Sequence, residues 1–328
     1  MATLVATPNK KASDGFATER KFPASTKKCS LLDQFVEQEE QMPEKKQQVT
    51  TNKNVAKIEF CFKEFLNMQG IHNQEYPIAL NAVFSTPGFS IKNSVLKFLG
   101  KNPYSAKDIE MFSLNLWQFE NYITGKPGSL ETFSRRTGLF LSALVNTSLD
   151  KDFTIVAENL SNPPMCVGEY NLKNLTIIGN VYGELGRDME RGSITINGNV
   201  DLHVGIEMRG GLITVNGNVK DTVGQWACGG TIIVNGDVEK SAGYGMYAGG
   251  TLIVNGNTGK DTCLAIFGGD VTINGNVNGQ LCENMKGGTV KVNGNIARIG
   301  PGIKDGNIFQ RGRQLVKDGK QIADIQNE

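Results

Sequence analysis

Side chains that could carry out chemistry are sparse in this sequence of 328 residues. It has two histidines, and one of them, His203, follows Asp201 in the stretch Asp-Leu-His-Val-Gly. Such a pair could act in acid–base catalysis, but a histidine in a polar loop is more often a solvent-exposed residue. The glycine-rich segment 243–250 does not fit a phosphate-binding loop, because such a loop leads into a helix and this one leads into a predicted strand. We therefore predict no catalytic, cofactor-binding or metal-binding residues.

Charged side chains crowd a few loops of the C-terminal half. They are Arg187, Glu190, Arg191, Glu207 and Arg209. A solvated charged edge is the simplest interpretation, and a surface for a ligand or a protein partner is the alternative. In the alternative case, a polar cleft should contain Glu184, Arg187, Glu207 or His203 with strongly shifted pKa values.

One short phrase recurs along the C-terminal half, as in "GGLITVNGNV" from Gly210 and "GGTIIVNGDV" from Gly229. Its central glycine returns every 19 or 20 residues, at Gly179, Gly198, Gly217, Gly236, Gly256, Gly275 and Gly294. Aliphatic residues stand four and two positions before nearly every one of these glycines and two positions after it. This alternation predicts one β-strand per repeat with one buried face.

Three other repeat architectures fit less well. Asn-Gly is also a hairpin signal, but the residues after each glycine alternate over too short a stretch to form a matching second strand. The frame of leucine-rich repeats is absent, and a hexapeptide left-handed helix would need three equivalent faces. We therefore predict a mainly β chain with a right-handed parallel β-helix of about seven 19-residue coils over residues 151–300.

Stacked coils place equivalent residues about 4.8 Å apart. The asparagine before each repeat glycine should then join a hydrogen-bonded ladder, and the glycine should supply a backbone conformation that other residues resist. The predicted ladder consists of Asn197, Asn216, Asn235, Asn255, Asn274 and Asn293.

Two groups of residues depart from the repeat. Cys263 and Cys282 stand where earlier coils have glycine, and stacking would bring their Cα atoms within the range of a disulfide; two reduced thiols filling the row are the other interpretation. Trp226, Tyr244 and Tyr247 have no counterparts in the other coils. They predict an aromatic patch suited to an interface, or a contact with the helical region.

The N-terminal half divides into two zones. Residues 1–52 are polar and predict a flexible arm. Residues 53–150 predict a small α-helical domain of four helices. The first helix begins near residue 53, the second ends at Gly100, the third has Ser105 and Asp108 in a capping box, and the fourth lies within residues 129–149. At the other end, residues 301–328 should cap the last coil, with a turn in Lys-Asp-Gly-Lys.

The half-phrases "LGRDMERG" (185–192), "VGIEMRGG" (204–211) and "VGQWACGG" (223–230) share a frame close to G-x-x-M-x-G-G, which joins to I-x-V-x-G-N-V. Over residues 165–300 this resembles the G-x-G-x-G β-helix family. That family includes the C-terminal domain of the glutamate synthase large subunit and one of the subunits of formylmethanofuran dehydrogenase. The resemblance implies a structural part of a larger enzyme. The catalytic parts of those relatives have no counterpart here, since Ala2 follows the first methionine and no cysteines cluster for an iron–sulfur centre.

Composition argues against a role in nucleic-acid binding or in a membrane. A net charge of +1 gives no electrostatic footprint for nucleic acid or an anionic membrane, and no apolar run approaches the length of about 18 residues that spans a bilayer. Six scattered cysteines are typical of reduced thiols in the cytoplasm, or in a host cytosol for a bacterial effector.

We expect a scaffold without cofactor that presents a helical domain to protein partners, as an accessory subunit of an oxidoreductase- or amidotransferase-type complex or as an effector. Its interaction edge would comprise Arg187, Arg191, Glu207, Arg209, Trp226, Tyr244 and Tyr247. The alternative is an enzyme or ligand-binding protein whose site lies between the helical domain and the first coils, so a small-molecule ligand stays open.

Overall fold

The computed structural model describes residues 52–67, 104–120 and 129–327, which belong to one compact unit. The predicted arm, apart from its last residue, and the helix predicted to end at Gly100 lie outside the described residues. Within the described ranges, no helix combines the length and apolar composition needed to cross a bilayer.

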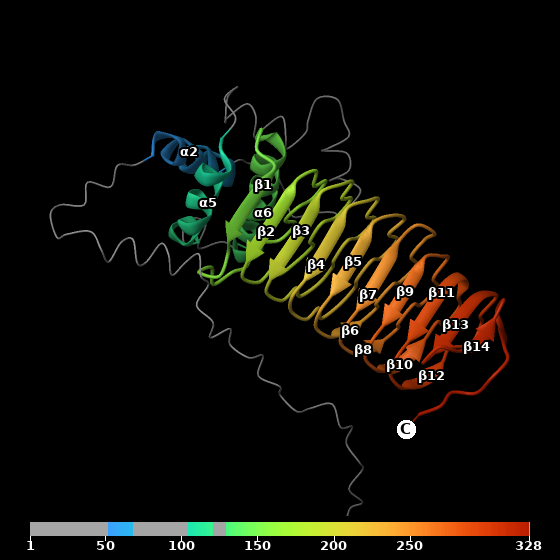
Figure 1. The fold of residues 1–328 in the computed structure, drawn as a ribbon. Coiled ribbons are helices and arrows are strands. Elements are labelled where there is room, and N and C mark those ends of the chain that lie inside the picture. The colour runs from blue at the N-terminus through green and yellow to red at the C-terminus, as the bar shows by residue number, and fades with distance from the viewer. Residues whose placement is uncertain (1–51, 68–103, 121–128, 328) are drawn as a thin grey trace, which may run out of the picture. The chain divides into compact units, whose positions relative to one another are not determined.

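The C-terminal part is a parallel β-solenoid of about eight turns over residues 152–310, which confirms the predicted fold class (Figure 1). Two strands without the repeat phrase, β1 and β13, add to the seven repeat strands, and the nine parallel strands make about eight turns in place of the predicted seven coils. The main sheet contains, in spatial order, β1 (Asp152–Val156), β2 (Asn174–Ile178), β3 (Ser193–Asn197), β4 (Leu212–Val215), β5 (Thr231–Val234), β7 (Thr251–Val254), β9 (Asp270–Ile273), β11 (Lys286–Val292), β13 (Asp305–Gln310), β14 (Arg313–Lys317) and β15 (Lys320–Gln321).

A second, smaller sheet forms another side of the coils. Its strands are β12 (Ile296–Ile299), β10 (Val277–Leu281), β8 (Thr258–Lys260) and β6 (Val238–Lys240). Single parallel bridges continue it through the earlier coils, for example between Val200 and Val219. Inward aliphatic side chains from both sheets form one continuous core with the helices, so burial of apolar surface holds successive coils in register.

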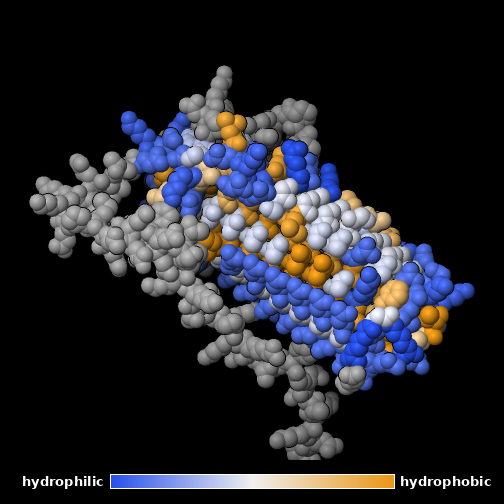
Figure 2. All heavy atoms as spheres, viewed as in Figure 1, coloured by the Kyte–Doolittle hydropathy of each residue, from blue (hydrophilic) through white to orange (hydrophobic). Residues whose placement is uncertain are grey.

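The corner between the two sheets carries two hydrogen-bonded ladders. In the first, the side-chain Nδ2 of each repeat asparagine donates to Oδ1 of the asparagine one coil earlier, over 2.6 to 2.8 Å. In the second, which was not predicted from the sequence, the side chain of the residue after the repeat glycine accepts a backbone N–H from the next coil. The second ladder needs only an acceptor, and Asp237 serves as one of its rungs. These polar residues contribute to a continuous hydrophilic band along the coils in Figure 2.

The reason predicted for the repeat glycines is wrong for six of the seven, since only Gly179 has a positive φ. The close approach of neighbouring coils excludes a side chain instead. A Cβ atom on Gly198 would lie 2.0 Å from the carbonyl oxygen of Gly179, and one on Gly236 would lie 2.1 Å from Oδ1 of Asn218.

Among the described residues, three helices and a short 3₁₀ turn precede the solenoid. They are α2 (Lys53–Asn67), α5 (Ala106–Leu114), η1 (Leu116–Phe119) and α6 (Ser129–Thr147). The predicted capping box is present at Ser105 and Asp108. The helices pack through buried aromatic rings, among which Phe62 lies 5.0 Å from Phe140 and 5.4 Å from Phe112, measured between ring centroids.

Helix α6 covers the first coil with a stripe of small and polar residues. Gly138 leaves room for the backbone, since a Cβ there would collide with the carbonyl oxygen of Met165. One turn later, Ser142 Oγ accepts the backbone N–H of Gly168 at 2.9 Å. After another turn, Asn146 donates to the carbonyl oxygen of Glu169 at 3.2 Å. The side chains of this stripe therefore form hydrogen bonds with backbone groups of the first coil, which has no preceding coil to supply them.

The far end of the solenoid is covered by residues 313–327. β14 and β15 pair through the turn predicted in Lys317–Lys320, and Ala323 and Ile325 pack against the core. Asn327 donates to and accepts from the backbone of Ile296, as a neighbouring strand would. The edge of β12 is therefore partly occupied.

Candidate functional site: the loop edge

The third side of each coil consists mainly of turns, and we call it the loop edge. It comprises residues 184–191, 203–210, 222–229, 241–248, 261–267 and 280–286. Each of these turns contains at least two residues with a positive φ. In the first three turns the first of them is glycine and the second is not: these second residues are Asp188 (52°), Glu207 (55°) and Trp226 (55°). Hydrogen bonds to the next coil, such as Glu207 N–H to the carbonyl of Gln225 at 2.9 Å, offset this strain. The loop edge therefore holds unusual residues on a rigid backbone.

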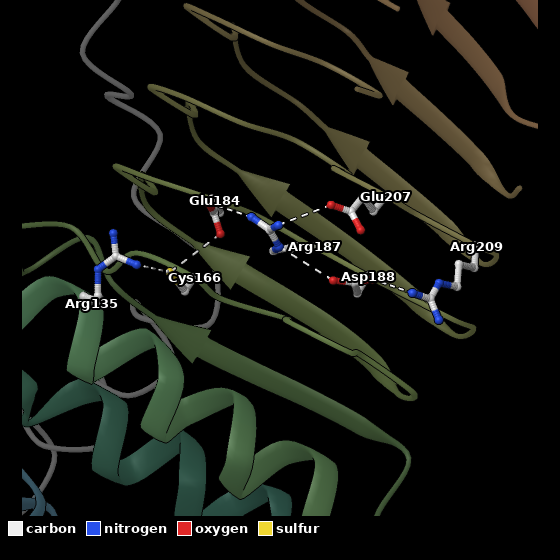
Figure 3. Close-up of polar contacts among 7 residues, drawn as sticks. All are labelled: Arg135, Cys166, Glu184, Arg187, Asp188, Glu207 and Arg209. Carbon is white, nitrogen blue, oxygen red and sulfur yellow. Dashed lines mark hydrogen bonds and ion pairs between the residues drawn. The ribbon is translucent and has the colours of Figure 1, made fainter. Parts of the chain in front are cut away.

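In the first coils, charged side chains form a half-buried network around Arg187 (Figure 3). Its guanidinium lies 3.2 Å from Oε1 of Glu184, 3.3 Å from Oε1 of Glu207 and 3.6 Å from Oδ2 of Asp188. Arg209 Nη2 lies 2.9 Å from the other oxygen of Asp188. Arg187 and Asp188 are buried, whereas Arg209 reaches solvent. This network, which we call the Arg187 network, ties neighbouring coils together by charge.

The network reaches helix α6 through a buried thiol. Arg135 Nη1 lies 3.7 Å from Sγ of Cys166, and that sulfur lies 4.0 Å from Oε2 of Glu184. Figure 3 shows this path from α6 to the loop edge. Glu184 is therefore connected to helix α6 through the Cys166 thiol.

Glu169 is buried beside the Arg187 network, and its Oε2 has no hydrogen-bond partner among the described residues. Burial raises the pKa of this carboxyl to about 8; the neighbouring carboxylate of Glu184 also raises it, and Arg187 lowers it. A carboxyl with this pKa is largely protonated at neutral pH. Glu169 is therefore the group here best suited to hold an exchangeable proton.

Other members of the cluster also have shifted pKa values. Burial and the Glu207 carboxylate raise the pKa of Asp188, against the two arginines that contact it. Burial lowers the pKa of Arg187, but the surrounding carboxylates outweigh that effect and raise it. Burial and nearby carboxylates raise the pKa of the Cys166 thiol, so this cysteine stays protonated and lacks the thiolate that a nucleophile needs. Within the described part of the chain, no group of three His, Cys, Asp or Glu side chains could hold a metal ion.

The later coils of the loop edge carry aromatic side chains in place of the charges. The rings of Tyr247 and Phe267 stack with centroids 5.0 Å apart and planes 15° apart. Lys286 places its ammonium 4.1 Å from the centre of the Phe267 ring. Trp226 lies 6.3 Å from Tyr244 between ring centroids. Trp226, Tyr247 and Phe267 are each about 40% exposed, so they form an aromatic section that water reaches.

Glycine makes room for the aromatic section. A Cβ on Gly245 would lie 2.8 Å from the indole ring of Trp226, so the ring rests on the backbone of the next coil. Phe267 and Lys286 were not predicted from the sequence. Their signal was their position eleven residues past the repeat glycine, the position that Tyr247 has in its own coil.

The other residues named from the sequence belong neither to the Arg187 network nor to the aromatic section. Cys263 and Cys282 are fully buried free thiols, with φ of 56° and 60° in a row otherwise occupied by glycine. His203 is half-buried and not exposed as expected, and its Nδ1 has no partner within the described residues. Arg191 is exposed. The segment 243–250 leads into β7, as predicted.

Fold and loop edge together define the class: a parallel β-solenoid with a helical cover over its first coil and a rigid, side-chain-bearing loop edge. No protein-family model matches the sequence, and no curated protein matches it either.

Proposed function

We propose that this protein is a non-catalytic interaction scaffold that binds a protein partner through the aromatic section of its loop edge. The observation that carries the proposal is the group of exposed rings at Trp226, Tyr247 and Phe267 on adjacent coils. Aromatic side chains dominate binding hot spots because they bury large areas at low entropic cost. The rigid coil beneath them supports binding without reorganisation.

A paired comparison of two loop-edge variants tests this function. The first replaces Trp226, Tyr247 and Phe267 by Ser in the full-length protein. The second, a control, replaces the exposed charges Glu190 and Arg191 by Gln. Both should keep the circular dichroism spectrum and melting temperature of the wild type. A protein that co-purifies in a fixed ratio with the wild type and the control, but not with the serine variant, supports the proposal. A partner retained by all three proteins contradicts it.

We also propose a second candidate, a ligand-binding site at the Arg187 network. It is favoured by Glu169, whose buried Oε2 lacks a hydrogen-bond partner among the described residues, because such groups are usually satisfied. A screen of small cationic and hydrogen-bonding ligands by thermal shift would test it. A ligand that raises the melting temperature of the wild type but not of Glu169→Gln supports this function, and equal shifts in both proteins oppose it.

The G-x-G-x-G β-helix family remains our proposed relative, supported by the repeat frame and the solenoid fold. On that proposal the partner belongs to an oxidoreductase or amidotransferase complex; the effector role is the other form of the same scaffold function. We place the protein in the cytoplasm, or in a host cytosol if it is an effector, consistent with the free thiols of Cys61, Cys166, Cys228, Cys263 and Cys282.

A further inference from the structure

The chain contains seven Asn-Gly pairs, and six of them are the first ladder of the solenoid corner. Asn-Gly is chemically the most labile asparagine sequence. The glycine amide nitrogen can attack the side-chain carbonyl carbon of the asparagine, because glycine has no side chain to block the approach. The seven pairs share this sequence and differ only in their surroundings, so the structure can rank them.

The ladder restrains its pairs against this attack. Asn235, for example, donates to Asn216 at 2.7 Å and accepts from Asn255 at 2.6 Å. The attacking nitrogen is also engaged in this coil, since Gly236 N–H bonds the carbonyl of Gly217 at 3.1 Å. Attack within this pair must first disrupt these hydrogen bonds.

The end rungs of the ladder are held less firmly. Asn197 accepts from Asn216 at 2.8 Å, but its own Nδ2 has no earlier rung to donate to. Asn293 donates to Asn274 at 2.8 Å and has no later rung to accept from. Their pairs should react more slowly than an unrestrained pair and faster than the inner rungs.

The seventh pair, Asn278–Gly279, lies in β10 outside the ladder. Between β10 and β12 the register passes from Val277 opposite Ile296 to Gln280 opposite Arg298, so these two residues face a single residue, Ala297. That arrangement is a β-bulge, in which the extra residue loses its ladder pairing. The Asn278 side chain is exposed and its amide makes none of the side-chain hydrogen bonds found among the described residues. Asn278 therefore lacks the side-chain hydrogen bonds that hold the ladder pairs. Its glycine is packed as closely as theirs, since a Cβ on Gly279 would lie 2.5 Å from the carbonyl oxygen of Gly259.

We propose that Asn278–Gly279 is a site of spontaneous modification, at which asparagine converts to aspartate and isoaspartate while the ladder pairs persist. The Gly279 nitrogen loses its proton to solvent and forms a bond to Cγ of Asn278, and the Cγ–Nδ2 bond breaks to release ammonia. Water then adds to either carbonyl of the cyclic imide and opens it, which gives the two products. Water is the only co-reactant, and no atom changes oxidation state.

Modification at this place changes the second sheet. Either product adds a negative charge to the exposed face of β10. Isoaspartate also adds a methylene group to the backbone within the bulge, next to the pairing of β10 with β12. Local opening of this edge should therefore follow modification, and hydrogen exchange would detect it at Val277 and Leu281, whose partners in β12 are Ile296 and Ile299.

The test is a time course on the full-length folded protein at mildly alkaline pH, followed by tryptic digestion and mass spectrometry. Asn274 and Asn278 fall in one tryptic peptide, between Lys260 and Lys286, so fragment ions must separate them. A protein isoaspartyl methyltransferase with a labelled methyl donor counts isoaspartate independently. We expect Asn278 to react at least about tenfold faster than any inner ladder rung, because those rungs must first break two hydrogen bonds.

Two further samples make the outcome decisive. In denaturant all seven pairs should react at similar rates, which shows that the fold sets the ranking. In the variant Asn216→Ala, the amide of Asn235 loses its acceptor, and its rate should rise while that of Asn278 stays unchanged. The proposal is wrong if an inner ladder pair of the folded wild type reacts as fast as Asn278. It is also wrong if Asn278 persists in the folded protein for as long as the inner rungs do.

Discussion

The corner of the solenoid and its loop edge are built on the same coils, but they use repetition differently. At the corner, each coil repeats asparagine, glycine and a second acceptor residue, and each coil makes the same hydrogen bonds. At the loop edge the backbone repeats while the side chains change, from the Arg187 network in the first coils to the aromatic section in the later ones. The residues repeated in every coil are those that the stacking of coils requires. The side chains that change from coil to coil lie at the loop edge, and they distinguish this protein from a solenoid of identical coils.

The largest effect should come from adding one methyl group at the corner. In Gly236→Ala the new Cβ would lie 2.1 Å from Oδ1 of Asn218 and 2.5 Å from the carbonyl of Gly217, and stacked backbones cannot both move. We expect a loss of about 4–5 kcal/mol in the free energy of unfolding, measured by denaturant titration. Gly312→Ala is the control, since nothing lies within 4 Å of its Cβ and only its φ of 80° opposes the change. Equal losses would mean that close approach is not what selects glycine at the corner.

At the loop edge, the largest effect should follow removal of the central cation. Arg187→Met leaves the carboxylates of Glu184, Asp188 and Glu207 without their shared partner. We expect a loss of about 3 kcal/mol, near the lower end for a broken buried pair, because Glu184 and Glu207 are in part open to solvent. The control is Lys220→Gln, which removes an exposed pair with Asp201 and should change stability by at most about 1 kcal/mol. A wild-type melting curve for Arg187→Met would show that the network contributes nothing to the fold.

The direction of the first ladder gives a smaller and more selective effect. An inner rung both donates and accepts a hydrogen bond. In Asn235→Asp a carboxylate oxygen would face Oδ1 of Asn216 in place of the donor, and we expect the free energy of unfolding to fall by about 1–2 kcal/mol. Asn197→Asp should be nearly neutral, because Asn197 only accepts within the ladder. Asn276→Asp should also be nearly neutral, since Asp237 already fills an equivalent place in the second ladder and the rungs next to Asn276 are both asparagine. Equal losses in all three variants, measured by thermal unfolding at neutral pH, would contradict a directional ladder.

A separate effect concerns the pH dependence of the loop edge. The pKa of Glu169 rises from an ordinary value of 4.5 to about 8 on folding. Between these values the unfolded chain has lost the proton that the folded chain keeps, so the free energy of unfolding falls as pH rises from about 4.5 to about 8 and then levels off. Glu169→Gln should remove this fall, because an amide does not titrate. Denaturant titrations of both proteins across that range give the comparison, and parallel curves would mean that Glu169 ionises normally.

Much of the fold could be read from the sequence, because the glycine period fixes the stacking and the stacking fixes the core. The same period gave the asparagine ladder and the exposed positions of Trp226 and Tyr247. The strand β1 could not be predicted from the sequence, since Asp152–Val156 carries no repeat phrase and packs between β2 and helix α5. The role of the corner glycines was misjudged because a sequence does not separate an unusual φ from a lack of space.

The sequence by itself therefore determined the coil, its period and the residues that every coil must share. These are consequences of local alternation and of one repeated spacing. Only the tertiary structure decided that Glu169 lies beside the Arg187 network and that Asn278 falls in a bulge. The physical reason is that both depend on small differences between neighbouring coils. Glu169 belongs to a first coil without the repeat phrase, and the bulge arises where β12 has one residue fewer than β10 between paired positions. Such differences in length carry no signal until the coils are stacked.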